Sequence, residues 1–302
     1  ANCALYCGAD ISFVDIDPDT YNLCPKALEQ KLIVAKNEDT LPKVIIPVHL
    51  AGQSCDMEAI AALAKQYDIR VIEDASHAIG AEYVGEAVGS CRFSVSALFS
   101  FHPVKIVTTG EGGVAVTNDA QLAERMQRLR SHGITRDPEL MTKAPDGAWY
   151  YQQIELGFNY RMTEMQAALG LSQMERLSSF VERRRELAKT YNALLSDLPV
   201  TLPQQLADTV SSWHLYIVRF DLSKIGKTQA QIFDECRAAG VGVNLHYIPV
   251  HIQPYYSDLG FRQGDYPVAE AYYANAISIP LFHSMTDAQQ DEVVRVLKEI
   301  VL

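Results

Sequence analysis

The stretch Arg70-Val-Ile-Glu-Asp-Ala-Ser-His77 decides the predicted fold, because a short apolar run ends there in a group of polar side chains. Similar apolar runs lie at residues 11–17, 43–49, 94–101 and 113–117. Between them, apolar residues at helical spacing predict helices over 25–34 and 56–67. Strands that alternate with helices indicate an α/β fold with a mostly parallel sheet covered on both faces.

The last third of the chain has a different pattern. Two more helices are expected before it, over 119–130 and 163–197. The segment Leu198-Pro-Val-Thr-Leu-Pro203 then interrupts the helical spacing. After it, two strands and two helices are expected, over 213–222, 241–247, 228–239 and 287–302. We therefore predict a large domain over 1–197 and a smaller α+β domain over 198–302.

Composition and charge limit the class of protein. The chain has 302 residues, of which 48% are hydrophobic and 21% charged, which is typical of a globular protein with a full core. Its net charge of −11 argues against a nucleic acid or an anionic membrane as partner. No apolar run approaches the roughly 20 residues that cross a bilayer, and residues 1–8 lack a signal-peptide pattern. We expect a cytoplasmic protein.

Cysteines and arginines suggest no special site. The six cysteines are too sparse for a disulfide scaffold, and they lie at positions 3, 7, 24, 55, 91 and 236. Cys3 and Cys7 are four residues apart, but no further ligand follows at zinc spacing, so we expect free buried thiols and no metal site. The basic run Glu182-Arg-Arg-Arg-Glu186 is interpreted as a salt-bridged helix surface rather than a phosphate site.

Lys105 is the first candidate catalytic residue. It follows an apolar strand and precedes the Thr- and Gly-rich loop 108–113, at the sheet edge where α/β proteins bind ligands. Most lysines are merely exposed surface residues. Here, however, Pro103 stiffens the approach and the glycines allow close contact between backbone and ligand. A lysine near apolar walls loses its proton more easily and can form a Schiff base.

Asp74 and His77 form the second candidate group, directly after the strand that contains Val71 and Ile72. Alone, Asp74 could equally be a helix cap, and His77 would more often be a structural histidine. Together with Lys105, an acidic side chain at a strand end suggests pyridoxal phosphate (PLP), whose pyridine nitrogen needs an acidic partner.

Three motifs together resemble the DegT-type nucleotide-sugar aminotransferases of PLP fold type I, and they span residues 73–80, 100–113 and 157–162. The resemblance extends over essentially the whole chain. It implies the PLP-dependent transferase fold, with a large domain built on a mostly parallel sheet and a smaller C-terminal domain. Two further stretches, 131–138 and 246–256, resemble the branch of this family that acts in pseudaminic acid synthesis.

The resemblance assigns a role to each matching residue. Lys105 matches the Schiff-base lysine, and Asp74 matches the partner of the pyridine nitrogen. His77 occupies the position that contacts the ring oxygen of the cofactor, and Ser100 matches a phosphate-binding hydroxyl. Asn159 matches an asparagine that reaches the phosphate in the neighbouring subunit, which implies a homodimer with shared active sites.

The resemblance also implies substrates, with residues that would meet the nucleotide-sugar at Arg161, His246, Tyr247 and His251. The reaction would move an amino group from glutamate, through PLP, to C4 of a UDP-linked 4-keto-6-deoxy-N-acetylhexose. Relatives begin with about another quarter-chain that includes a phosphate-binding turn and an aromatic that stacks on the ring. We therefore expect this sequence to be a fragment of a longer enzyme.

Three alternatives stay open at this point. A sugar dehydratase of the same family usually has His in place of the lysine, so Lys105 argues against that activity. An aminotransferase for another nucleotide-linked keto-sugar would differ only in its pocket residues. A non-catalytic PLP-binding relative or an inactive fragment is the third alternative.

Overall fold

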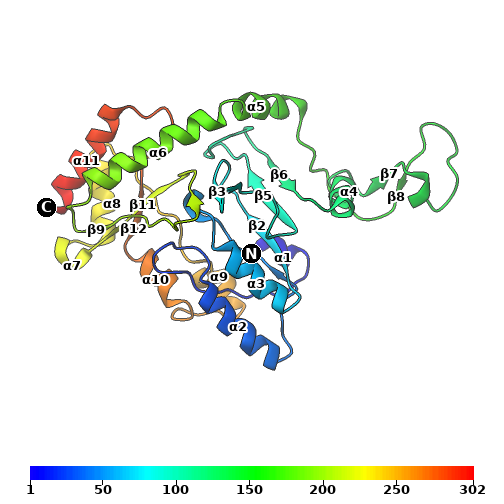
Figure 1. The fold of residues 1–302 in the computed structure, drawn as a ribbon, viewed down its shortest axis with the longest axis horizontal. Helices are drawn as coiled ribbons and strands as arrows, with labels where there is room; N and C mark the ends of the chain where they lie inside the picture. The colour runs from blue at the N-terminus through cyan, green and yellow to red at the C-terminus, as the bar shows by residue number, and fades with distance from the viewer.

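A computed structural model describes all 302 residues and contains a four-stranded central sheet (Figure 1). Its strands, in the order β1-β2-β5-β6, are Val44–Ile45, Arg70–Asp74, Ser96–Ser100 and Gly113–Val116. β2 pairs in parallel with β1 and β5, whereas β6 runs antiparallel to β5. The sheet is therefore mixed. The connection from β5 to β6 is short and contains no crossover helix. A hydrogen bond of 2.8 Å from Phe101 N–H to the Gly112 carbonyl closes it.

Helices α2 (Pro25–Asn37) and α3 (Met57–Gln66) cover one face of this sheet, as expected from their apolar spacing. Pro25 occupies the first turn of α2, where no amide hydrogen is needed. Asp56 caps α3 by accepting a hydrogen bond from Ala59 N–H. The buried residues of both helices form one apolar cluster with strands β1 and β2.

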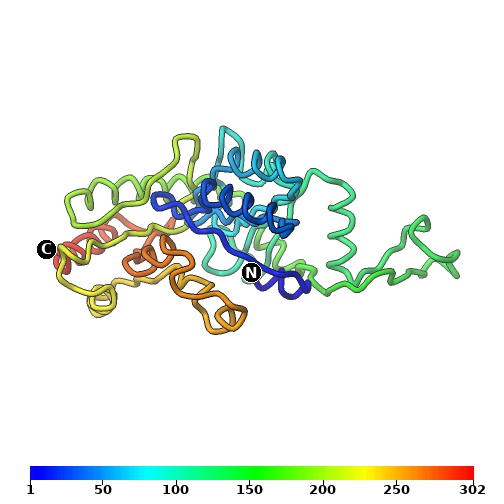
Figure 2. The backbone as a smooth tube through the Cα atoms, turned by 90° about the horizontal axis from the view of Figure 1, so that it is seen from below, coloured from blue at the N-terminus to red at the C-terminus, as the bar shows by residue number.

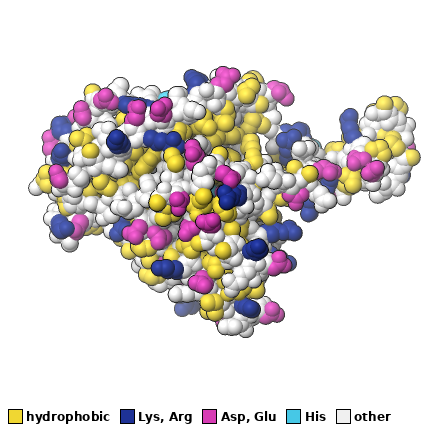
Figure 3. Space-filling model, viewed as in Figure 1, with side chains coloured by type: hydrophobic (Ala, Val, Ile, Leu, Met, Phe, Trp, Pro, Cys, Tyr) yellow, Lys and Arg dark blue, Asp and Glu magenta, His cyan; other side chains and the backbone are white.

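The other face of the sheet is less covered than expected. Its apolar side chains Val44, Ile46, Val48 and Leu98 are 38–43% exposed. Apolar side chains also gather over β5 and β6 and below α5 in the space-filling view (Figure 3). Because paired residues of parallel strands share a face, Asp74 lies on the same face as its partner Leu98.

The predicted helix over 163–197 is two helices, α5 (Glu164–Met174) and α6 (Leu177–Leu194). Thr163 and Gln166 cap α5 reciprocally, as a capping box. The helices are separated at Glu175 and Arg176, where no Pro or Gly marks the break in the sequence.

The largest apolar core lies in the last third of the chain, together with α6. It packs α8 (Gln229–Ala238) and α11 (Asp287–Val301) against an antiparallel sheet. That sheet has the order β12-β11-β9, with strands Ala276–Ile279, Tyr216–Phe220 and Val200–Thr201. The strands predicted over 11–17 and 241–247 are wrong, because each makes only one isolated bridge, Ile16 with Leu23 and Asn244 with Ser278. The domain boundary at 197/198 stays a prediction.

An arm projects from the body of the molecule (Figures 1 and 2). It contains α4 (Ala120–Leu129), capped by Asp119, and a small hairpin of β7 (Ile134–Thr135) and β8 (Gln152–Gln153). The other short elements are α1 (Asn2–Tyr6), β3 (Glu82–Tyr83), β4 (Glu86–Ala87), β10 (Thr209–Val210), α7 (Leu222–Ile225), α9 (Pro254–Asp258) and α10 (Pro267–Tyr273). None of the helices combines the length and apolarity that crossing a bilayer requires.

Candidate active site

The candidate site lies at the carboxyl ends of β2 and β5. Asp74 ends β2 and Ser100 ends β5, and alternation along β5 puts both residues on the same face of the sheet. Lys105 lies in the turn that follows β5, where its amide donates to the His102 carbonyl at 3.0 Å. Burial lowers the pKa of Lys105, and the nearby Asp74 carboxylate partly offsets this effect. The two charges therefore interact across the strand ends.

His77 is buried beside these residues and is 6% exposed. Its Nδ1 accepts a hydrogen bond of 3.3 Å from Ala51 N–H, and its Nε2 lies 3.4 Å from the Tyr247 hydroxyl. Burial, followed by the charge of Lys105, lowers the pKa of His77 to about 3. The ring is therefore neutral at physiological pH.

His246 and Tyr247 bring a distant part of the chain to this cluster. His246 Nδ1 lies 2.8 Å from Ser278 Oγ of β12. Burial and then Lys105 lower the pKa of His246, whereas burial and then Asp74 raise the pKa of Tyr247. The structure thus brings together Asp74, His77, Lys105, His246 and Tyr247.

His214 belongs to the same cluster, although the sequence analysis missed it. Its ring centroid lies 4.4 Å from that of His77. Burial, then His77 and Lys105, lower the pKa of His214, and its buried Nδ1 has no hydrogen-bond partner. The only local signal in the sequence is its place before an apolar strand. In the structure, the preceding residue Trp213 has a φ of 51°. Backbone in that region is uncommon for a bulky residue.

Three predicted site residues lie elsewhere. His251 is 3% exposed, with its Nε2 2.8 Å from Glu270 Oε1 and its ring against Tyr266. Asn159 and Arg161 are exposed in the segment between the arm and α5, and neither forms a side-chain hydrogen bond or ion pair with the cluster. Their predicted roles depend on a partner subunit or a bound substrate.

The basic run on α6 is only partly the salt-bridged surface that its sequence suggests. Arg183 pairs with Glu186 and Asp287, as expected. Arg184 and Arg185 instead bind main-chain carbonyls, so for them the interpretation was wrong.

Arg184 links the main chain at Trp213 and His214, beside the site, to the main chain just after β12. It is 5% exposed, and its Nη1 donates to the carbonyls of Trp213, His214 and Leu281 at 3.1, 3.2 and 2.8 Å. Burial without a carboxylate partner lowers the pKa of Arg184 to about 10. The carbonyl dipoles stabilise the positive charge of the Arg184 guanidinium in the protein interior.

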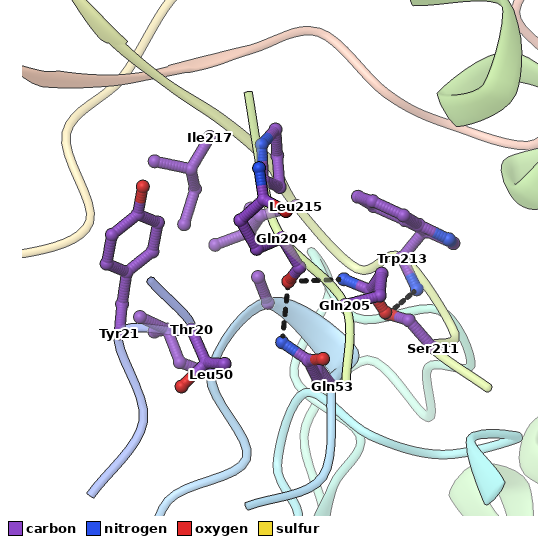
Figure 4. Close-up of a pocket in the computed structure, with 12 residues that line it drawn as sticks. Thr20, Tyr21, Leu50, Gln53, Gln204, Gln205, Ser211, Trp213, Leu215 and Ile217 are labelled. Carbon is purple, nitrogen blue, oxygen red and sulfur yellow. Dashed lines mark hydrogen bonds between the residues drawn. The ribbon is translucent and has the colours of Figure 1, made fainter. Parts of the chain in front are cut away.

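A small cavity lies behind the site, between the turn at 50–53 and the segment 203–217 (Figure 4). Its volume is about 20 Å³, which is room for about one water molecule. Gln53 crosses it by donating from Nε2 to the Gln204 carbonyl at 3.0 Å. The cavity is therefore too small for a sugar nucleotide.

Comparison with known proteins identifies the family. Residues 1–298 match the DegT/DnrJ/EryC1/StrS aminotransferase family. The protein MJ1066 of Methanocaldococcus jannaschii is 38% identical over 96% of this chain and 73% of its own length. The spore coat polysaccharide biosynthesis protein SpsC of Bacillus subtilis is 36% identical over 100% of this chain and 76% of its own length. The chain thus spans about three-quarters of the length of these relatives.

Solved structures give the same result. PseC of Helicobacter pylori, an aminotransferase involved in the biosynthesis of pseudoaminic acid, superposes with a TM-score of 0.89 at 29% identity, over 100% of this chain and 76% of PseC. Spr1654 of Streptococcus pneumoniae, which is assigned as a sugar aminotransferase and solved in a PLP form, superposes with a TM-score of 0.87 at 29% identity, over 99% of this chain and 77% of Spr1654. The chain therefore belongs to the DegT/DnrJ/EryC1/StrS family, and it is a sugar aminotransferase that depends on PLP.

Proposed function

We propose that the protein transfers an amino group from glutamate to C4 of a UDP-linked 4-keto-6-deoxy-N-acetylhexose. The product would be UDP-4-amino-4,6-dideoxy-N-acetyl-β-L-altrosamine, for pseudaminic acid synthesis. The observation that carries the proposed chemistry is the convergence of Lys105, Asp74 and His77 at the ends of two neighbouring strands. Similarity to PseC at 29% identity supports the choice of sugar.

The residues of the cluster fit PLP. Lys105 offers the amine for covalent attachment, Asp74 a carboxylate for the pyridine nitrogen, and Ser100 a hydroxyl for the phosphate. His77 presents its Nε2 to the same space, and His214 has a buried Nδ1 without a partner. Bound PLP supplies an electron sink for the electron pair released when the α-proton of the amino donor leaves.

Lys105 is also suited to move that proton. Because burial lowers its pKa, more of the amine is uncharged at neutral pH than in an exposed lysine. An uncharged Nζ accepts a proton and returns it, which is general acid–base catalysis by one group. The Asp74 carboxylate lies near it and partly offsets this lowering of the pKa. Neutral His77 adds no competing positive charge.

We further propose that the active unit is a homodimer in which Asn159 completes the phosphate pocket of the partner subunit. The segment that carries Asn159 and Arg161 extends from the arm, which buries little within its own chain (Figure 2). Its neighbours Trp149 and Tyr160 are each 74% exposed. Exposed aromatic side chains are enriched at interfaces.

A second candidate is an aminotransferase for another nucleotide-linked keto-sugar. Spr1654, which is assigned as a sugar aminotransferase with no particular sugar named, is as similar to this chain as PseC at 29% identity and supports this candidate. The candidates share every residue discussed for PLP and differ only in the acceptor.

The experiment is a substrate comparison with PLP and ¹⁵N-labelled glutamate. We expect label to appear at C4 of the UDP-linked 4-keto-6-deoxy-N-acetylhexose, with slower transfer to a dTDP-linked 4-keto-6-deoxyhexose that lacks the N-acetyl group. Faster transfer to the dTDP-linked sugar would favour the second candidate. Absence of transfer to any keto-sugar, in protein that binds PLP, would contradict the proposal.

A further inference from the structure

The hydrogen-bond pattern around His77 selects one tautomer of its ring. Because Ala51 N–H donates to Nδ1, that nitrogen carries no proton, and the neutral ring must hold its proton on Nε2. Nε2 is the atom that faces the Tyr247 hydroxyl at 3.4 Å. His77 therefore presents a hydrogen-bond donor to the site, not an acceptor.

The donor to Nδ1 lies in an unusual turn. Ala51 has a φ of 58°, a conformation that a non-glycine residue keeps only when its surroundings hold it. Gly52 follows with a φ of 101°, and a Cβ there would lie 2.6 Å from Ser212 Oγ and 2.8 Å from Trp213 N. The turn is thus pressed against the segment that leads to His214.

Asn22 holds the two ends of this turn. Its side-chain Oδ1 accepts from Leu50 N–H at 2.9 Å, and its Nδ2 donates to the Gln53 carbonyl at 3.0 Å. The side chain is buried, and Asn22 is 2% exposed. One side-chain amide therefore binds the residues on either side of Ala51 and Gly52. From the opposite side, the turn is held by main-chain hydrogen bonds from Ser212 and Leu215.

We propose that Asn22 is a positioning residue, which clamps the turn Leu50–Gln53 and so fixes His77 as an Nε2–H donor toward the cofactor. The tautomer follows from this chain alone. The effect on the cofactor rests on the proposed function.

The first test reads the tautomer directly, in protein without cofactor. Side-chain ¹⁵N shifts distinguish protonated from unprotonated ring nitrogens, and the His77 signals are assigned by their loss in His77→Gln. We expect a single Nε2–H form in the wild type and a mixture of both tautomers in Asn22→Ala. Asn22→Asp keeps the acceptor for Leu50 N–H but loses the donor to Gln53, so it should lie between them. Asn22→Asp is also the test variant to use if Asn22→Ala does not fold.

Two control variants separate positioning from general loss of stability. Ala51→Gly keeps the amide hydrogen and suits a positive φ, so it should keep the wild-type tautomer. Asn275→Ala removes an amide that accepts from Arg219 and has no bond to the turn. It should lower stability without changing the His77 signals. Unchanged His77 signals in both Asn22 variants would overturn the proposal.

The second test is the dissociation constant for PLP, measured from the cofactor absorbance. We expect Asn22→Ala to weaken binding about 5- to 10-fold, the range for one disturbed hydrogen bond in a buried site. A mixed tautomer with wild-type affinity would also overturn the proposal, because the donor would then not matter to the cofactor. If the wild type itself does not bind PLP, the proposed function fails, and the ¹⁵N spectra still decide the tautomer.

Discussion

The Nε2 atom of His49 lies 2.8 Å from Oε2 of Glu73, and His49 has no exposed surface. Ser94 donates its hydroxyl to the other carboxylate oxygen at 2.5 Å, and Cys55 N–H donates to His49 Nδ1 at 3.1 Å. Burial raises the pKa of Glu73, but the hydrogen bonds from His49 and Ser94 outweigh it and lower the pKa overall. This network lies under the strand end that carries Asp74.

The network predicts a large cost for removing its carboxylate. Glu73→Ala leaves His49 and Ser94 without an acceptor in the interior, which should lower the free energy of unfolding by about 1–3 kcal/mol. The control is Glu86→Ala, which breaks the exposed pair with Arg92 and should change stability by less than about 1 kcal/mol. Denaturant unfolding measures both variants. Equal losses would show that the buried network is not specially stabilising.

Borohydride reduction of the PLP-loaded protein should attach the cofactor to the peptide that contains Lys105. We expect Lys105→Ala to abolish both the attachment and the transfer of the amino group, because the amine and the proton carrier are lost together. Lys65→Ala, which changes an exposed lysine in α3, is the control and should keep both. Peptide mapping that finds the cofactor on another lysine would refute the assignment.

Asp74→Asn should lower kcat on the order of 10²-fold, because it removes the charge proposed to keep the pyridine nitrogen protonated while it preserves shape. The absorbance spectrum of bound PLP should change as well. Asp68→Asn is the matched control, since Asp68 is exposed and its φ of 55° suits asparagine equally. A near-wild-type rate for Asp74→Asn would contradict the assignment of Asp74 as the partner of the pyridine nitrogen.

Mixing two inactive variants tests the shared site. If Asn159 serves the cofactor of the partner, a heterodimer of Lys105→Ala and Asn159→Ala chains has one site with both changes and one with neither. Activity should then recover to about one-quarter of the wild-type value, for random exchange and independent sites. If Asn159 acts within its own chain, every site keeps one change and mixing restores nothing.

Stability should fall in acid because of His77. Its pKa is about 3 in the folded protein against 6.5 ordinarily. Between these pH values the unfolded chain binds a proton that the folded chain does not. The free energy of unfolding therefore drops below pH 6.5 by up to about 1.4 kcal/mol per pH unit for this residue, and is independent of it above. His214, whose pKa is also lowered, adds to the same trend.

The check is the stability of His77→Gln across this pH range. Glutamine does not titrate, so the variant should lose stability less steeply than the wild type between pH 6.5 and 4. Parallel curves for the two proteins would mean that His77 is protonated as easily in the folded state as in the unfolded state.

The sequence predicted the members of the cluster that lie in recognisable motifs. Strand β2 with Asp74 at its end has the predicted limits, since apolar residues and a strand-end acid are local signals. His214 could not be found in this way, because its role comes from a tilted ring contact with His77, 137 positions earlier in the chain. Strand β6 was predicted over 113–117, but its antiparallel direction was not, since strand direction depends on how the Gly-rich loop closes.

Burial of charge was also hard to predict from the sequence. Arg183, Arg184 and Arg185 look alike on a helix with acidic neighbours, and only packing against the segment 211–214 separates them. Backbone acceptors have no sequence signature, so a charge run gives no sign of which arginine will be buried.

The three carbonyls held by Arg184 carry a consequence for sequence divergence. Main-chain oxygens are present whatever side chain occupies a position, so Trp213 and Leu281 can change during evolution without loss of this link. The guanidinium itself has no equivalent substitute, because lysine cannot present the same planar set of donors. Selection on the geometry of this segment therefore falls on Arg184 itself, which binds the site through the His214 main chain.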